Sequence, residues 1–212
     1  MEKYLDEFLD YLEKEDRYSC IKYVNDALSS GKFNIVDLYE KILKPSLNNI
    51  ECNLKDKKLC IWKEHVRSSI VRTIIENCYS YVINERNLDK SPKKTGKVVV
   101  FCPDGEYHEI GARIVSDFFT LCGYDSIFIG SSTPKEEFIS ILDVLNPRYI
   151  AISVTNYYNL VAAKKAITEI RKTASGNLKI LVGGNAFVRN PEAYKEIGAD
   201  GFIDTFSDIK AL

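Results

Sequence analysis

The chain has 212 residues, of which 45% are hydrophobic and 28% are charged, a composition typical of a folded globular protein. The net charge of -1 gives no general attraction to a nucleic-acid backbone. No apolar run approaches the ~20 residues that a membrane helix needs, and Met1–Asp6 lacks the basic-then-apolar order of a signal peptide, so we expect a cytoplasmic protein with no membrane partner.

The cysteines are spread along the chain and contain no Cys-x-x-Cys pair. This spacing does not suit a zinc or iron–sulfur site, which needs clustered thiolates. Since the expected compartment is reducing, we expect thiols and not disulfides. The six positions are Cys20, Cys52, Cys60, Cys78, Cys102 and Cys122.

Apolar residues recur at helical spacing through the first 88 residues and predict a bundle of four or five helices. One helix is expected over Asp16–Ser29, followed by a glycine as its C-terminal stop. Asn34 is suited to cap a third helix, and Pro45 interrupts that helix or starts the next. A long helix is predicted over Ile61–Ile83.

The pattern changes after residues 87–96, a polar, proline-containing stretch that we interpret as an interdomain linker. Beyond it, short β-branched runs alternate with helical segments. This alternation predicts the α/β class, with a five-stranded parallel doubly wound domain over residues 97–212. The expected strands are Lys97–Cys102, Ser126–Ile129, Tyr149–Val154, Lys179–Val182 and Gly201–Ile203.

The loops after the predicted strands are the informative segments, because ligands of doubly wound sheets bind beyond the carboxyl ends of the strands. After the first strand, His108 is one of only two histidines in the chain and is expected in the first turn of the next helix. Glu106 precedes it by two residues, where it can accept a hydrogen bond from one ring nitrogen and leave the other free for a metal. A surface histidine beside a solvated carboxylate remains an alternative.

Two further strand ends carry unusual residues. Ser153 and Thr155 place hydroxyl groups on one side of an extended segment, where they can bind a ligand or cap the next helix. Gly183 and Gly184 follow the fourth strand and permit a flat ligand to approach the main chain closely. A simple left-handed turn is the alternative for the glycine pair.

Taken together, these residues resemble the cobalamin-binding family of corrinoid proteins, in which a helical cap precedes a flavodoxin-like cobalamin domain, as in methyltransferase corrinoid proteins. The family signature is Asp-x-His-x-x-Gly, then Ser-x-Leu, then Gly-Gly. The resemblance covers nearly the whole chain and implies cobalamin as the cofactor. The matching residues are Glu106, His108, Gly111, Ser153, Thr155, Gly183 and Gly184.

The resemblance also implies a role for each residue. His108 would bind the cobalt as its lower axial ligand, and the dimethylbenzimidazole tail would enter the domain past Ser153 and the two glycines. Two residues depart from the family pattern: Glu106 is one methylene longer than the usual aspartate, and Thr155 replaces a leucine.

The helical part, residues 1–88, resembles the family's cap domain. Glu64 and His65 resemble the Glu-His pair that the cap presents over the upper corrin face. Spacing alone leaves open that His65 is a partly exposed helix residue paired with nearby charges. The light-sensing branch has a tryptophan ten residues before that pair, and Leu54 at this position disfavours that branch.

By this resemblance, the chain would carry a methyl group on cobalt between partner methyltransferases. The cobalt would supply the chemistry, so we expect no catalytic side chain, and whether the chain counts as an enzyme or as a component of a methyltransferase system stays open. An alternative is a cobalamin-dependent sensor or light-responsive regulator that acts through protein contacts. A third is a flavodoxin-like domain without a corrinoid. Formation of a homo-oligomer also stays open.

Overall fold

The computed structural model describes residues 1–48, 57–133, 139–140, 142, 144–174 and 177–212. The chain divides into two compact units, Met1–Asp89 and Lys90–Leu212. The expectations for Cys52 and Leu54 lie outside the described residues. Across the described ranges, no helix is both long and apolar enough to cross a bilayer.

The first unit is helical throughout its described elements, which confirms the predicted bundle. A π-helical turn, η1, joins α3 to α4 without a break. This wide turn ends two residues before Pro45, which has no N–H to donate and whose ring clashes with the preceding turn of an ordinary α-helix. The elements are α1 (Glu2–Glu13), α2 (Arg17–Ser29), α3 (Ile35–Leu38), η1 (Tyr39–Leu43), α4 (Lys44–Asn48) and α5 (Lys57–Leu88).

Capping side chains begin two of these helices, and the cap at Asn34 confirms the sequence prediction. The Asp16 carboxylate accepts a hydrogen bond from the backbone N–H of Ser19 at the start of α2. The Asn34 side chain accepts one from the N–H of Asp37 at the start of α3. Gly31 follows α2 with a φ of 67°, the left-handed conformation of a helix stop.

The cysteine expectation is wrong at one position. Cys60 is disulfide-bonded, although cysteine spacing and the expected compartment favoured thiols. A disulfide depends on the separation of two sulfur atoms in the folded chain, and sequence spacing does not give that separation. Four other cysteines carry thiols, as expected, namely Cys20, Cys78, Cys102 and Cys122.

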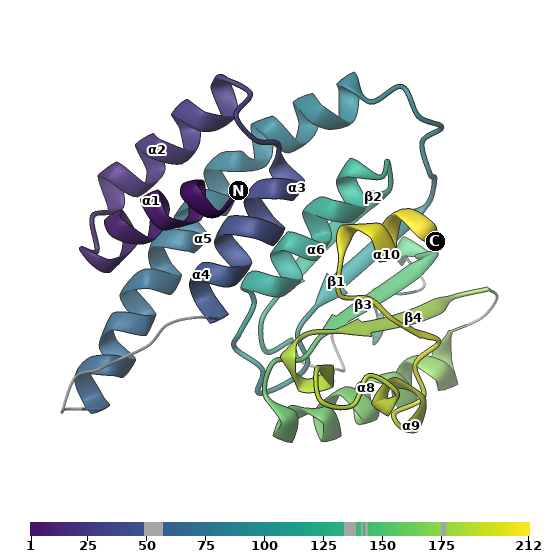
Figure 1. The fold of residues 1–212 in the computed structure, drawn as a ribbon. Helices are drawn as coiled ribbons and strands as arrows, with labels where there is room; N and C mark the ends of the chain where they lie inside the picture. The colour runs from purple at the N-terminus through teal and green to yellow at the C-terminus, as the bar shows by residue number, and fades with distance from the viewer. Residues whose placement is uncertain (49–56, 134–138, 141, 143, 175–176) are drawn as a thin grey trace. The chain divides into compact units, whose positions relative to one another are not determined.

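The second unit is built on a five-stranded sheet in the order β2-β1-β3-β4-β5, in which every neighbouring pair is parallel. This arrangement confirms the predicted flavodoxin-like fold. Figure 1 shows α6 and α10 on one face of the sheet and α8 and α9 on the other. The strands are β1 (Lys97–Phe101), β2 (Asp125–Gly130), β3 (Tyr149–Ser153), β4 (Lys179–Gly183) and β5 (Gly201–Phe202). The helices with described ends are α6 (Ile110–Leu121), α8 (Leu160–Thr173), α9 (Ala193–Glu196) and α10 (Phe206–Ala211). Two 3-10 turns are η2 (Tyr157–Asn159) and η3 (Asn185–Phe187).

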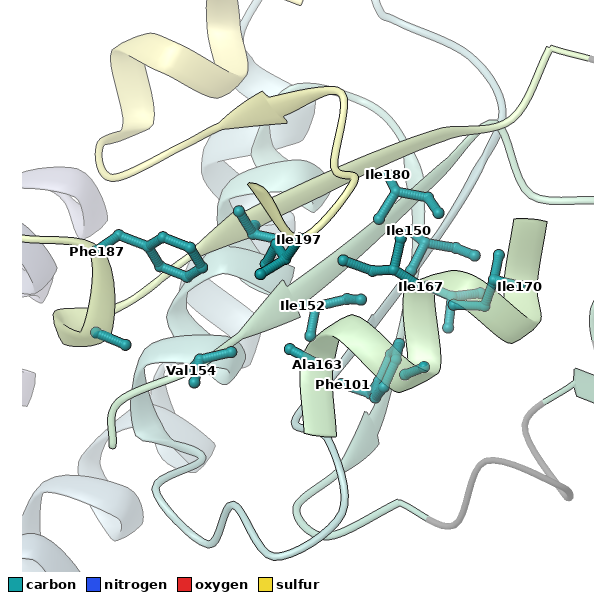
Figure 2. Close-up of a cluster of buried hydrophobic side chains, with 14 of the residues drawn as sticks. Phe101, Ile150, Ile152, Val154, Ala163, Ile167, Ile170, Ile180, Phe187 and Ile197 are labelled. Carbon is teal, nitrogen blue, oxygen red and sulfur yellow. The ribbon is translucent and has the colours of Figure 1, made fainter. Parts of the chain in front are cut away.

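The core of this unit lies between the sheet and α8. All five residues of β3 are buried, as expected for a central strand with helices on both faces. In Figure 2, Ile150 and Ile152 of β3 lie near Ile167 of α8, and all three are at most 1% exposed. This packed layer fixes the carboxyl ends of β1, β3 and β4, from which the candidate site is built.

Candidate functional site

The candidate site lies at the carboxyl ends of β1 and β3. These strands are neighbours in the sheet. The strand that follows β1 in the chain, β2, lies on one side of β1, whereas β3 lies on its other side. Such a reversal separates the two following loops and is where doubly wound folds bind ligands. Glu106 and His108 lie in the loop after β1, and Ser153 is the last residue of β3.

His108 is presented on the loop between β1 and α6. It lies two residues before the helix begins at Ile110, and so not in its first turn as predicted. Its side chain is 60% exposed, and Nδ1 lies 2.6 Å from Oε1 of Glu106. Because an ionised carboxylate only accepts hydrogen bonds, this contact assigns the proton to Nδ1. Nε2 then keeps its lone pair, as a metal ligand requires.

Glu106 is fully buried, so the alternative of a solvated loop carboxylate is wrong. Its Oε1 also accepts a hydrogen bond from the backbone N–H of His108 over 3.1 Å. Its Oε2 accepts three more, from the N–H of Thr155 at 3.0 Å, the N–H of Asn156 at 2.9 Å and Nδ2 of Asn159 at 3.0 Å. Despite its extra methylene, Glu106 therefore keeps the hydrogen bond to the histidine ring. Its carboxylate also connects the loops after β1 and β3.

Two opposing influences act on the pKa of Glu106. Burial is the largest and raises it, because a charged carboxylate loses its hydration. Hydrogen bonds from Asn159, from Asn156 and from His108 lower it, and together they outweigh burial. The pKa of Glu106 therefore lies below its ordinary value, and the carboxylate that orients His108 is ionised near neutral pH.

The loop after β1 is also held from the side of β2. The N–H of Ser132 donates to the Glu106 carbonyl over 3.0 Å, and the N–H of Gly105 donates to Oγ of Ser132 over 3.2 Å. Nearby, burial and the charges of Glu106 and Glu109 raise the pKa of Cys102 to about 12. This thiol therefore stays protonated near neutral pH, which disfavours it as a metal ligand.

Small residues surround Ser153 at the end of β3. Gly183 is its partner across the β3–β4 pair, and a Cβ placed on Gly111 would lie 3.7 Å from Oγ of Ser153. The structure thus brings together two glycines and a buried serine that are far apart in the sequence. A Cβ on Gly183 would come within 2.4 Å of the Ile203 carbonyl oxygen, so this position accepts only glycine.

Gly184 continues the chain beyond β4 with a φ of 102°, which favours glycine. A Cβ at this position would approach the Val154 carbonyl oxygen to 2.4 Å. The backbone is therefore closely packed where β3 and β4 end. At this edge of the sheet, Gly183 and Gly184 expose main-chain atoms that a larger side chain would cover. Such an edge suits a flat or elongated ligand.

Two predicted residues lie in the first unit. Glu64 and His65 belong to α5, and both side chains are exposed. In the second unit, Asn159 was not among the predicted site residues, although its amide donates to Glu106. The sequence offered only a weak indication of this contact, because Asn159 is simply a polar residue a few positions after the strand that ends in Ser153.

The match to a known protein family lies within the second unit of the chain. The family model described as the B12 binding domain matches residues 96–210. A corrinoid protein of Desulfitobacterium hafniense is 30% identical over 118 residues, which are 55% of this chain and 54% of that protein. The chain thus spans about half the length of the curated relatives that it matches at 27 to 30% identity.

Solved structures share the fold over nearly the whole chain. The monomethylamine corrinoid protein of Methanosarcina barkeri superposes with a TM-score of 0.78 at 15% identity, covering 99% of this chain and 96% of that one. A chain of the methanol:cobalamin methyltransferase complex of the same organism has a TM-score of 0.51 at 18% identity, covering 99% and 77%.

Proposed function

The chain belongs to the B12-binding domain family, with cobalamin as its cofactor, and we propose that it is a corrinoid carrier for partner methyltransferases. Cobalamin supplies a cobalt centre that can accept and release a methyl group. The role of the chain is then to hold that centre, to tune it through the lower axial ligand and to leave the upper face accessible to a partner.

The observation that carries this proposal is the pairing of His108 with Glu106. A buried, ionised carboxylate fixes the proton on Nδ1 of a histidine whose side chain is 60% exposed. Outer carboxylates that orient histidine ligands in this way also raise the basicity of the ligating nitrogen. We therefore assign His108 as the lower cobalt ligand and Glu106 as the residue that orients it.

The edge formed by β3 and β4 is assigned to the nucleotide tail of cobalamin. Ser153 supplies a buried hydroxyl there, while Gly111, Gly183 and Gly184 supply backbone without side chains. Thr155 contributes the N–H that holds Glu106, so its role does not require the leucine found in the family pattern. These residues fit a long, partly flat group inserted between the strand ends.

Glu64 and His65 are assigned to the upper face of the corrin. Both side chains are exposed on α5, so neither is committed to the core of the first unit. In this role, residues 1–88 form the cap domain that the family pattern implies. The domain assignment, a cap over 1–88 and a cobalamin domain over 97–212, is part of this proposal.

The names of the relatives support a carrier. Proteins that resemble this chain are named trimethylamine and dimethylamine corrinoid proteins, and a structural neighbour is part of a methanol:cobalamin methyltransferase complex. None of these names describes a sensor, so no specific observation favours the sensor alternative. We therefore propose a methyltransferase as the partner.

Binding of hydroxocobalamin by the purified chain tests the proposal. We expect a red complex of about one-to-one composition that survives desalting, because a tail held between strand ends dissociates slowly. The His65→Ala variant should retain the cobalamin and change only the absorption spectrum of the bound form, because the residues assigned to the tail all lie in the second unit.

Two outcomes would count against the carrier. If all colour elutes with small molecules, the chain does not bind cobalamin in the proposed way. If the loaded chain changes its oligomeric state on illumination, measured by light scattering, the sensor alternative is favoured. A carrier should keep the same mass in darkness and in light.

A further inference from the structure

The loop after β2 is bonded to the segment that follows β1. The N–H of Ser132 donates to the Glu106 carbonyl over 3.0 Å, and its Oγ accepts a hydrogen bond from the N–H of Gly105 over 3.2 Å. One residue further along, the N–H of Thr133 donates to the Cys102 carbonyl over 3.2 Å. These bonds join the two loops beyond the strand ends, and Ser132 bonds the part of the β1 loop that leads to the histidine.

Ser132 adopts an unusual backbone conformation. Its φ is 48°, in the left-handed region that residues other than glycine rarely adopt, because there the Cβ approaches a carbonyl oxygen. Such a conformation persists only where other interactions offset its cost. Here the N–H and the hydroxyl of one residue bond two consecutive residues, Gly105 and Glu106. The contacts of Ser132 with the loop after β1 therefore explain its strained backbone.

The backbone and the side chain of Glu106 are held from opposite sides of β1. Its carboxylate accepts hydrogen bonds from the loop after β3, whereas its carbonyl accepts one from Ser132 in the loop after β2. The sheet order places β2 and β3 on opposite sides of β1. Because a peptide unit is planar, fixing the Glu106 carbonyl also fixes the N–H of Tyr107, the residue that precedes His108.

We propose that Ser132 is a positioning residue for the cobalt ligand: it fixes the main chain of Gly105 and Glu106 so that His108 is presented to the metal in one position. The inference deepens the proposed function and rests on His108 as the lower ligand. Without the hydroxyl, the N–H of Gly105 loses its acceptor and the loop is held less firmly against β2. The Glu106 carboxylate keeps its own partners, so the histidine ring keeps its proton on Nδ1 but loses part of its fixed position.

The test compares Ser132→Gly and Ser132→Ala with the unchanged full chain, each loaded with hydroxocobalamin and reduced to the cob(II) form. Electron paramagnetic resonance measures the ratio of cobalt with an axial histidine nitrogen to cobalt without one. Both variants remove the hydroxyl. We expect both to lower this ratio by about three- to tenfold, the factor that the loss of one hydrogen bond gives.

Thermal unfolding of the apoproteins distinguishes positioning from a merely structural role. Glycine adopts a positive φ without strain and alanine does not, so Ser132→Gly should unfold at a higher temperature than Ser132→Ala. The two variants should nevertheless lose the histidine-bound form to the same extent. If Ser132→Gly keeps the ratio of the unchanged chain and only Ser132→Ala lowers it, backbone strain accounts for the effect and the proposal is overturned.

Thr133→Ala is the matched control. Thr133 is the next residue of the same loop, and its hydroxyl donates to the Gly130 carbonyl within that loop over 3.3 Å. Its N–H, which bonds Cys102, is retained in the variant. Thr133→Ala should keep the histidine-bound ratio of the unchanged chain. A decrease as large as that of Ser132→Gly would contradict a specific role for the Ser132 hydroxyl.

A fourth variant separates this inference from the proposed function. If His108→Ala keeps the histidine signal, His108 is not the ligand and its assignment under the proposed function fails. If His108→Ala removes the signal but neither Ser132 variant alters it, only the role of Ser132 is wrong.

Discussion

At the scale of single residues, the site depends on one buried carboxylate with five hydrogen bonds. Glu106 accepts from the backbone and ring of His108 and from three donors after β3. Burying a charge is costly unless hydrogen bonds replace its lost hydration, and here they do so on both oxygens. Glu106 therefore stabilises the fold as well as orienting the histidine.

Replacement of Glu106 by glutamine should lower the stability of the fold by an amount that depends on pH. The pKa of Glu106 lies below its ordinary value in the folded chain, so its stabilisation is present above about pH 4.5 and is lost as the pH falls through the folded pKa. Near neutral pH, Glu106→Gln should lower the free energy of unfolding by about 1–3 kcal/mol, because one amide group then faces N–H donors.

Denaturant unfolding of the apoprotein between pH 7 and pH 3 measures this effect. The difference between the unchanged chain and Glu106→Gln should shrink as the solution becomes more acidic. Asp104→Asn provides the control, since Asp104 is an exposed carboxylate in the same loop. A difference that stays constant over the whole range would show that ionised Glu106 does not stabilise the fold.

The sequence predicted the residue types of the site better than their contacts. His108 and Glu106 were identifiable because they follow a strand at the place where this fold binds ligands. The hydrogen bond between them also follows from their spacing. Asn159 was not predicted, because its contact with Glu106 crosses 53 positions of sequence and depends on how two loops meet in three dimensions.

At the scale of elements, the strand ends and the start of α6 form the edge assigned to the nucleotide tail. The five predicted strands agree with the observed ones to within one residue at each end, because β-branched runs mark buried parallel strands clearly. The π-helical turn η1 was not predicted, since Pro45 indicates an interruption without specifying its geometry. Its effect is confined to the first unit.

Gly111→Ala should separate stability from cobalamin binding. Gly111 is in the first turn of α6, and an added Cβ makes only an ordinary contact of 3.7 Å with Oγ of Ser153. Since alanine favours helix more than glycine does, the free energy of unfolding should stay constant or rise by up to about 1 kcal/mol. Retention of hydroxocobalamin should nevertheless fall, because the methyl group narrows the edge beside Ser153.

Equilibrium dialysis with hydroxocobalamin and thermal unfolding measure the two effects in parallel. Thr168→Ala on α8 is the control, since it also introduces alanine into a helix but lies outside the residues assigned to the tail. If Gly111→Ala binds hydroxocobalamin as tightly as Thr168→Ala does, the tail does not pass Gly111.

At the scale of the whole molecule, the chain consists of two compact units, Met1–Asp89 and Lys90–Leu212. The family match covers residues 96–210 of the second unit, whereas the likeness to the monomethylamine corrinoid protein covers 99% of the chain. The change from helical to alternating patterns already indicated this division in the sequence.

The central claim is that His108 binds the cobalt from below, and isotope labelling tests it most directly. The full chain is produced with ¹⁵N-labelled histidine, loaded with unlabelled hydroxocobalamin and reduced to the cob(II) form. An axial ¹⁵N nucleus splits the cobalt resonance lines into doublets, whereas the ¹⁴N of dimethylbenzimidazole splits them into triplets. We expect doublets in the labelled chain and their loss in His108→Ala with cobalamin still bound. Triplets in the labelled, unchanged chain would contradict the account, because the lower ligand would then be the cofactor's own base.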